Sequence, residues 1–487
     1  MVKVRWMFQS RLQVAVLAAV GCWLVGVQMA AAQSGSGVVP LPGANWGPTD
    51  ISDEMVTYAS HVAPILQENC VLCHRARSIA PMSLESYEQA KQFAPLIKLK
   101  VANRLMPPWP LDKGVGIQQF KNDISLTDDE IETIVRWVDE GAPLGDLTAV
   151  PEAPEWPEWE DAWNYGQVFN RPPDMVIRSP AYTVVANGMD QTPPLQTTLD
   201  DLREDRWIRA IEIRSATPET RMVFHHANTS ILMREEGSDD VERAELAASA
   251  MGLEGYIYPD DTGRLIRPGS TVSFNMHLVP IDHDVEAILE LGVWFHDSEP
   301  EFETPGEVHF RISQTTGFGG FPGHSTDPQI SGSWPGLVLP PNRMVTYRST
   351  YVLDRPARIY SLRGHFHLRA KYAVLEVVYP DGRYELINKL DWAHQWHVSF
   401  LYDDDAMPLL PKGTTVLVTA VFDNTAANPG NPDPDQWVTW GPRTVDEMSH
   451  FRYGVTWFDN QEDFDRLVEE RERALAEKGP IAVSDSR

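Results

Sequence analysis

The chain has 487 residues, a formal net charge of -28 and 43% hydrophobic residues. This much negative charge argues against nucleic-acid partners and against anionic membranes, because both favour clustered Lys and Arg. The apolar content suffices for ordinary folded cores, and the length predicts about three domains once an N-terminal segment is set aside.

The chain begins like an exported protein. Basic residues precede an apolar run from Leu12 to Val27, and the small residues Ala30-Ala31-Ala32 follow it. This is the pattern of a removable secretion signal, so we expect residues 1–32 to be a signal peptide. A retained membrane anchor is one alternative, for which the run is short. Membrane attachment by lipidation of Cys22 is the other, although the residues before Cys22 fit a lipidation site poorly.

The sequence Cys70-Val71-Leu72-Cys73-His74 is the attachment motif of a c-type haem. Its two thiols are spaced to bond the haem vinyl groups, and the adjoining imidazole can ligate the iron. A zinc site would need a second Cys or His pair nearby, and none follows. The motif predicts one covalent haem c held by Cys70, Cys73 and His74. Together with the signal peptide it predicts a periplasmic protein.

The haem iron also needs a second axial ligand. Met106 lies in Leu105-Met106-Pro107-Pro108-Trp109, where two prolines make a stiff loop that can hold a thioether against the iron. Met82 is the competing candidate, and either methionine could instead be a packing residue. On loop rigidity and spacing we predict Met106.

Short helices should surround this haem. Tyr58–Asn69 fits a helix that leads into the motif, and Thr127-Asp128-Asp129-Glu130 is a capping box that begins another helix. Gly141 and Pro143 should end that helix. The pattern over residues 53–147 resembles the class I cytochrome c domains of bacteria, which implies an all-α fold.

A stretch rich in Pro, Glu and Trp marks a boundary, and we assign residues 148–172 to a linker. Beyond it, short β-branched runs alternate with turn residues, and strands are expected at Trp207–Ile213, Thr271–Leu278, Ala287–Phe295, Tyr372–Tyr379, Arg383–Asn388 and Thr415–Phe422. Such spacing predicts all-β sandwiches or jelly rolls, and the length requires two, over residues 173–335 and 336–460. Residues 461–487 should form a charged helix and a tail.

The β-rich region also carries several of the chain's 14 His in tight sets. His365 and His367 alternate along a strand, so they share a face and can bind one metal ion. His225 and His226 are adjacent and would point to opposite faces unless the strand ends or bulges there. His277 stands alone. Imidazole ligands suit copper or zinc, and an added thioether favours Cu(I).

These histidines belong to a longer ordered pattern. Its parts are Phe224-His225-His226, Met276-His277, His365-Phe366-His367, Asp423-Asn424-Thr425 and the segment from Trp440 to Met448. In these residues the chain resembles the copper type II, ascorbate-dependent monooxygenases, the family of peptidylglycine α-hydroxylating and dopamine β-monooxygenases. The resemblance covers about residues 173–460.

The resemblance implies two jelly-roll domains that face each other across a solvent-filled cleft, each holding one copper. The implied ligands of the electron-transfer copper are His225, His226 and His277. The implied ligands of the catalytic copper, where dioxygen reacts, are His365, His367 and Met448. The animal enzymes are disulfide-rich, whereas this chain has 3 Cys. Its domains must therefore be stabilised by packing, to which its aromatic residues can contribute.

For three more side chains near this pattern, the sequence allows two roles each. Arg363 occupies the position that binds a substrate carboxylate in the peptide-hydroxylating enzymes, but it can equally be a structural or solvated arginine. His394 and His397 could support the metal ligands from outside, and packing within an aromatic core explains them equally well.

Copper monooxygenation consumes two electrons per turnover, and a tethered haem can supply them at high local concentration. We therefore expect a monooxygenase that uses dioxygen to hydroxylate a C–H bond of a small organic substrate, with a periplasmic electron donor feeding the haem. One alternative is a copper and haem dehydrogenase that passes substrate electrons to the cytochrome without dioxygen. Another is a non-catalytic electron carrier joined to a copper-binding sandwich. The sequence does not identify the substrate.

Overall fold

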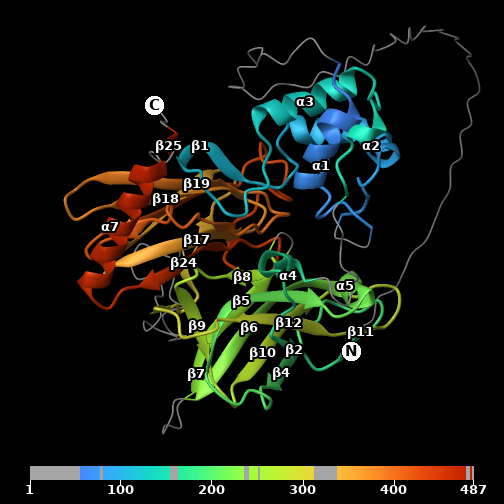
Figure 1. Cartoon of the computed structure of the whole chain (residues 1–487). Helices are drawn as coiled ribbons and strands as arrows, with labels where there is room; N and C mark the ends of the chain where they lie inside the picture. The colour runs from blue at the N-terminus through green and yellow to red at the C-terminus, as the bar shows by residue number, and fades with distance from the viewer. Residues whose placement is uncertain are drawn as a thin grey trace, which may run out of the picture. The chain divides into compact units, whose positions relative to one another are not determined.

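The computed structural model describes residues 55–76, 80–153, 163–234, 241–250, 253–311, 337–441, 443–478 and 483–484. The chain divides into two compact units, Met1–Pro48 and Thr49–Arg487, and all described residues lie in the second. The expected signal peptide, Cys22 and residues 154–162 of the expected linker lie outside the described residues. The described structure is mostly β-sheet with few helices (Figure 1). Within it, no helix is both long enough and apolar enough to cross a membrane.

The N-terminal helices pack around a hydrophobic core of their own. They are a π-helical turn at Tyr58–Val62 (η1), α1 (Ala63–Asn69), α2 (Tyr87–Ala102) and α3 (Asp128–Asp139), with a 3-10 turn at Leu147–Ala149 (η2) beyond them. Trp137 and Ile134 of α3 meet Ile97 of α2 and Leu66 of α1 in this core. The expected capping box of α3 is confirmed, because the side chain of Thr127 accepts from Glu130 N–H while the Glu130 carboxylate accepts from Thr127 N–H.

Between α2 and α3 the chain contributes a strand that the sequence did not predict. Strand β1 (Leu111–Ile117) pairs antiparallel with β19 (Tyr384–Asp391), with Leu111 opposite Leu390. Just before β1, the ring of Trp109 packs edge-on against Phe400, with ring centres 4.7 Å apart. The segment expected to be purely helical therefore contains a strand. Two glycines and two charged residues in seven positions give β1 little strand character of its own.

The first β-rich region consists of three sheets. One has the order β13-β9-β5-β12-β2, with β8 also on β5; another has the order β4-β10-β6-β7; and β11 pairs with β3. Their bounds are β2 (Met175–Arg178), β3 (Tyr182–Val184), β4 (Pro194–Thr198), β5 (Arg206–Ser215), β6 (Phe224–Arg234), β7 (Val241–Ser249), β8 (Gly255–Ile257), β9 (Thr262–Ile266), β10 (Thr271–Leu278), β11 (Val285–Ala287), β12 (Leu289–Phe295) and β13 (Phe302–Glu303). Two short helices, α4 (Asn164–Phe169) and α5 (Pro218–Val223), precede β2 and β6 respectively. Along β10 buried residues alternate with less buried ones, as expected for a strand with one face in the core.

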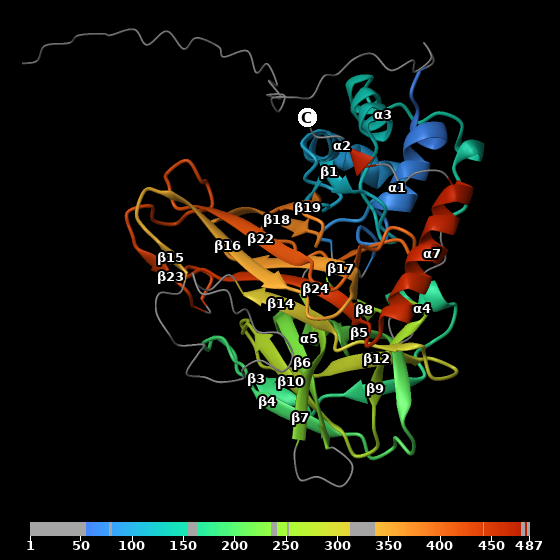
Figure 2. The ribbon, with the colours of Figure 1, turned by 90° about the vertical axis from the view of Figure 1, so that its left-hand side faces the viewer.

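The second β-rich region has two main sheets, of order β16-β22-β18-β19-β1-β25 and β14-β24-β17-β20, with β21 also on β17. Most of these strands are labelled in Figure 2. A short pair, β15 and β23, stands apart. The bounds are β14 (Glu307–Arg311), β15 (Val338–Leu339), β16 (Met344–Val352), β17 (Ala357–Phe366), β18 (Ala370–Val378), β20 (Phe400–Leu401), β21 (Leu409–Leu410), β22 (Thr415–Asp423), β23 (Val438–Thr439), β24 (Ser449–Trp457) and β25 (Val483–Ser484).

The two main sheets of this region meet through large apolar side chains. Phe366 of β17 contacts Phe422 of β22, with ring centres 6.0 Å apart. Gly364 permits this approach, because a Cβ atom at that position would stand 2.5 Å from Leu390 Cδ2. The expected C-terminal charged helix is present as α7 (Gln461–Lys478), and its Phe464 packs with Phe458 and Phe302.

One strand pairs outside the domain to which the sequence assigns it. Strand β14 lies within residues 173–335, the range expected for the first β-domain, but it pairs with β24 of the second region. A boundary near residue 335 therefore does not separate the sheets. The pairing partner lies more than a hundred residues further along the chain, which no local pattern of β14 could reveal.

Candidate functional site

The first group of histidines lies on the adjacent strands β6 and β10. The rings of His225, His226 and His277 are mutual neighbours, with centres 5.3 Å, 5.2 Å and 5.0 Å apart for the three pairs. His226 lies directly opposite His277 in the β6–β10 ladder. The pair and the lone histidine of the sequence are thus brought together by strand register.

A bulge explains how adjacent histidines reach one group. In the ladder His277 faces His226, and the next residue, Leu278, faces Phe224, so His225 has no partner of its own. An extra residue of this kind turns its side chain away from strict alternation. The expectation that the strand must bulge or end at this point is confirmed.

Asp190 holds one ring of this group. Its carboxylate is 2.9 Å from His277 Nε2, while His277 Nδ1 is 3.3 Å from His226 Nε2. Burial, followed by the nearby His277, His225 and His367, lowers the pKa of His226 to about 4. Burial and His277 also lower the pKa of His225. These two imidazoles are therefore neutral at neutral pH, which is the form that binds a metal ion.

The second group gathers at the end of β17 and the beginning of β24. The ring centres of His365 and His367 are 5.9 Å apart. His365 lies opposite His450 and Phe366 opposite Ser449 in the β17–β24 ladder, so Met448, which precedes Ser449, lies at the same end as His367. Burial lowers the pKa of both His365 and His367. His367 Nδ1 lies 3.3 Å from the carbonyl oxygen of Asp446, which leaves Nε2 available to a metal.

Glu447 ties the parts of this second group together, a role that the sequence did not reveal. Its side chain is fully buried, and its carboxylate accepts hydrogen bonds from the backbone N–H groups of His367, Arg369 and Met448. It therefore fastens the H-x-H segment to the segment that carries the methionine. Burial raises the pKa of Glu447 to about 7, against the lowering effect of these three donors.

The charges of the two histidine groups influence each other. The pKa of His226 in the first group responds to His367 in the second. The pKa of His397 is lowered by burial, by Arg363 and then by His394, His226 and His225. Residues of the two β-rich regions therefore influence each other's titration at this place.

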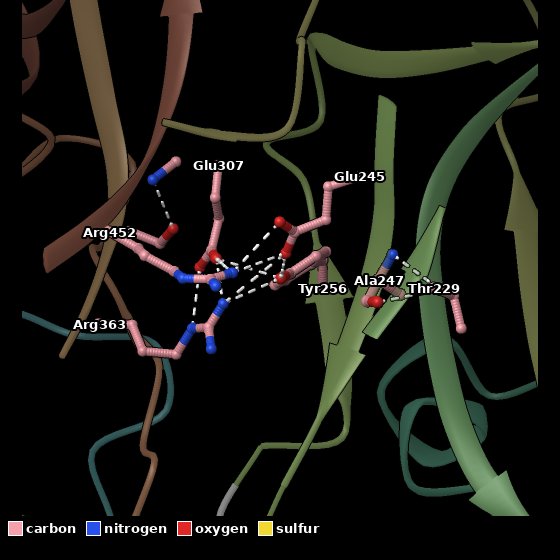
Figure 3. A network of polar contacts seen from close by, with 9 residues as sticks. Thr229, Glu245, Ala247, Tyr256, Glu307, Arg363 and Arg452 are labelled. Carbon is pink, nitrogen blue, oxygen red and sulfur yellow. Dashed lines mark hydrogen bonds and ion pairs between the residues drawn. The ribbon is translucent and has the colours of Figure 1, made fainter. Parts of the chain in front are cut away.

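Arg363 is fully engaged in a buried network rather than open to a ligand (Figure 3). Only 3% of its surface is exposed, and its guanidinium pairs with the buried carboxylate of Glu307 and with Tyr256 Oη at 3.1 Å. Arg452 joins the same network through Glu245 at 2.9 Å. The network links strands of both β-rich regions. A substrate carboxylate could reach Arg363 only by displacing Glu307, so the structural reading of this residue is the better one.

The haem motif directly follows α1. Cys70 and Cys73 are free thiols, and His74 N–H donates to the carbonyl oxygen of Cys70 at 2.8 Å. His74 Nδ1 lies 3.1 Å from the carbonyl oxygen of Met82. This contact fixes one ring nitrogen and leaves Nε2 as the atom able to ligate iron. The Met82 backbone therefore lies beside Nδ1, so Met82 would be a poorer candidate than Met106 for a second ligand of an iron held by Nε2.

Charged groups of the first β-rich region lie close to the haem motif. The pKa of the Cys73 thiol is raised by burial and then by Glu254, while Arg75 and Arg221 oppose these effects. Arg221 belongs to α5, which leads directly into His225 and His226. The haem motif thus lies near the segment that carries the first histidine group.

A second buried carboxyl accompanies Glu254. Glu212 accepts the backbone N–H groups of Asn164 and Tyr165 at 3.0 Å and 2.8 Å, at the beginning of α4. Burial and the neighbouring Glu254 raise the pKa of Glu212 to about 8. This acidic pair was not evident from the sequence, because Glu212 lies in β5 and Glu254 directly precedes β8, which pairs with β5.

The histidines fit metal ions in composition and spacing, although the rings must rotate to bind one. As placed, no group of three or more His, Cys, Asp or Glu within the described part of the chain could hold a metal ion. Imidazoles bound to one ion at a metal–nitrogen distance of about 2.0 Å have ring centres about 5 Å apart. The first group, at 5.0 to 5.3 Å, already has this spacing. His74, His277 and His367 each have one ring nitrogen beside an oxygen atom, as metal-binding histidines do.

Comparisons with known proteins add little to this geometry. No protein-family model matches the chain, and no curated protein matches it significantly. Solved structures with some similarity include peptide:N-glycanase F, at 8% identity over 59% of this chain and 97% of that chain, with a TM-score of 0.25. Allantoicase from Saccharomyces cerevisiae has 11% identity over 52% of this chain and 74% of its own, with a TM-score of 0.18. An oxalate decarboxylase has 10% identity over 65% and 87%, with a TM-score of 0.15.

Proposed function

We propose that this chain is a periplasmic monooxygenase that carries one covalent haem c and two coppers and hydroxylates a C–H bond of a small organic substrate with dioxygen. In this proposal residues 53–147 form a cytochrome c domain whose distal loop is anchored in the second β-rich region. The two β-rich regions are the two jelly-roll domains of a copper monooxygenase. A periplasmic donor supplies the electrons.

The observation that carries the proposal is the assembly of the ordered motifs into two histidine groups. Motifs that are 51 residues apart in the chain meet in the first group, at the ring spacing expected for imidazoles on one ion. His365, His367 and Met448 lie at one end of another sheet. Each group draws on one β-rich region, which supports two copper sites with unlike ligands.

The haem assignment is supported by the surroundings of His74 and by the loop that carries Met106. With Met82 held at the Nδ1 edge of His74, Met106 is the better axial ligand. Its loop continues into Trp109, which is 8% exposed and packed against Phe400. An anchored, proline-rich loop of this kind holds a weak thioether ligand in place.

When bound, the haem and coppers supply the electrons and the dioxygen activation that C–H hydroxylation needs. The residues of the chain position these groups and exclude competing reactions. Asp190 orients His277, the carbonyl oxygen of Asp446 orients His367, and Glu447 keeps His367 and Met448 at a fixed separation. We assign Arg363 to the framework beneath the second site and not to substrate binding.

Metal analysis of the periplasmic protein is the first test. We expect one haem that survives denaturation and about two coppers per chain, falling to one in His226→Ala and in His365→Ala. X-ray absorption of the reduced protein should show a sulfur neighbour of copper that Met448→His removes. Stoichiometric zinc in place of copper, in protein matured with ample copper, would contradict the assignment.

Labelled dioxygen then distinguishes a monooxygenase from a dehydrogenase. With a chemical reductant and a panel of small C–H substrates, the product should carry labelled oxygen, and His365→Ala should abolish substrate-dependent oxygen uptake while the haem stays reducible. His225→Ala should also abolish turnover, because it removes a ligand of the first site. Unlabelled product formed at full rate without dioxygen, with haem reduction tracking substrate loss, would instead establish a dehydrogenase.

A further inference from the structure

The loop between β19 and β20 carries two histidines, His394 and His397, whose roles the sequence left open. The loop is fixed at both ends. Trp392 Nε1 donates to the carbonyl oxygen of His367 at 2.8 Å, and the Trp392 ring packs on Phe366 with centres 5.2 Å apart. At the other end, Asn122 Nδ2 donates to the carbonyl oxygen of Ser399 at 2.7 Å, and Asn122 Oδ1 accepts from Leu401 N–H at 2.9 Å.

This fixed loop places one histidine beside each histidine of the H-x-H segment. The ring centres of His397 and His365 are 5.0 Å apart, and those of His394 and His367 are 6.5 Å apart. Two imidazoles on one ion require about 5 Å. The pair His365–His397 therefore has the required spacing, and it is closer than the pair His365–His367 at 5.9 Å.

Packing also restricts the ring of His397. The ring is in edge contact with Trp392, with centres 5.4 Å apart, so its orientation is restricted. A half-buried imidazole that is already held beside His365 loses little entropy on binding a metal ion.

We propose that His397 is a third imidazole donor to the copper at the second site, beside His365, His367 and Met448. The inference rests on the proposed function, because it takes the second site to bind copper. A thioether is a weak ligand, and a third imidazole would keep the ion bound when the sulfur is removed or oxidised. His394, whose ring is farther from its neighbour, is not assigned as a ligand.

The test isolates the second site and removes only the nitrogen atoms of His397. His226→Ala provides a parent protein in which the remaining copper belongs to the second site. His397→Phe in this parent keeps an aromatic ring against Trp392 and His365 but removes both ring nitrogens. His394→Phe in the same parent is the matched control from the same loop. Full-length proteins are loaded with Cu(I), whose affinity is measured by competition with a chromophoric Cu(I) chelator, and the ligands are counted by X-ray absorption.

We expect His397→Phe to weaken Cu(I) binding by about tenfold or more and to lower the number of imidazole ligands from three to two. His394→Phe should change the affinity less than about threefold. Adding Met448→Leu to the parent should remove sulfur but keep copper, and adding His397→Phe as well should release it.

An imidazole count of two in the parent, or equal Cu(I) affinity with and without His397→Phe, would overturn the inference while leaving the proposed function intact. Equal weakening by the two loop variants would also overturn it, because the cause would then be loop disorder. A wild-type protein that binds no copper would overturn the proposed function together with this inference. If His397→Phe does not fold, His397→Gln and the ligand count of the parent decide the question.

Discussion

The two histidine groups are built in different ways. The first depends on the register of two neighbouring strands and one bulge, and its outer partner Asp190 is 59% exposed at the side chain. The second is surrounded by buried polar groups, with Glu447 and Arg363 almost without exposure and a pinned loop beside it. The first kind of site follows from the pairing of two strands, whereas the second also depends on buried polar contacts and on a loop from another part of the chain. The variants below should therefore perturb the first site in its metal affinity and the second in the stability of the fold.

The largest effect should come from removing the buried charge beneath the second group. Arg363→Met leaves Glu307 buried without its main partner, and breaking a pair of this kind costs about 3–5 kcal/mol. Urea unfolding should show this loss as a lower free energy of unfolding. The slope of that free energy against urea concentration should not change. Arg443→Ala is the control, because Arg443 is largely exposed where it pairs with Asp446 and its removal should change stability little. A stable Arg363→Met protein with weakened substrate binding would restore the substrate-binding reading.

A somewhat smaller loss should follow from Glu447→Ala. Three backbone N–H groups would lose their acceptor in a buried place, which should cost about 2–3 kcal/mol of unfolding free energy. Glu447→Gln retains one acceptor oxygen and should lose about half as much. Both are measured by urea unfolding of the copper-free protein, so that lost metal binding does not contribute. Equal stability of all three proteins would show that Glu447 does not fasten the second group.

Asp190→Asn should leave stability unchanged but weaken the first site. Asp190 is largely exposed, so its removal creates no buried unpaired group. It orients His277, and losing such an outer partner lowers metal affinity by about tenfold or more. Cu(I) competition in a His365→Ala background, which leaves only the first site, measures the effect. The same substitution in a His226→Ala background should change nothing.

The smallest effect should be a pH dependence of stability from Glu212 of β5. Its pKa is raised to about 8 by burial and by Glu254, above the ordinary value near 4.5. The folded protein therefore holds a proton that the unfolded chain releases, so the stabilising contribution is fully present below pH 4.5 and is lost as pH rises through about 8. Between pH 6 and 7 the free energy of unfolding should therefore fall with a slope of about 1 kcal/mol per pH unit because of this group. Glu212→Gln should flatten it in unfolding measurements, and an unchanged slope would assign the dependence to other groups.

Those parts of the structure that rest on short-range patterns were predictable. The capping box at Thr127 and Glu130 begins α3, and Thr271–Leu278 is the strand β10, with the expected bounds. The bulge beside His226 was expected if the adjacent side chains of His225 and His226 are to reach one place. In each case the residues that decide the geometry are neighbours in the chain or on the next strand.

Features that depend on distant partners were not predictable. Strand β1 is recognisable only when β19 is present, and β14 pairs with a sheet from the far end of the chain. Glu447 looks like an ordinary surface residue in sequence until its carboxylate is seen among three buried N–H groups. The position of His397 beside His365 likewise depends on how the loop after β19 folds, which local sequence does not show.

The pairing of β1 with β19 also sets the order in which the chain can fold. Asn388 Nδ2 donates to the carbonyl oxygen of Ile117, a contact between residues that are 271 positions apart. The segment that contains β1 is synthesised long before β19, so β1 must wait unpaired, and long-range pairing of this kind folds slowly. A chain that ends before β19 would expose the edge of β1 to other chains and would tend to aggregate.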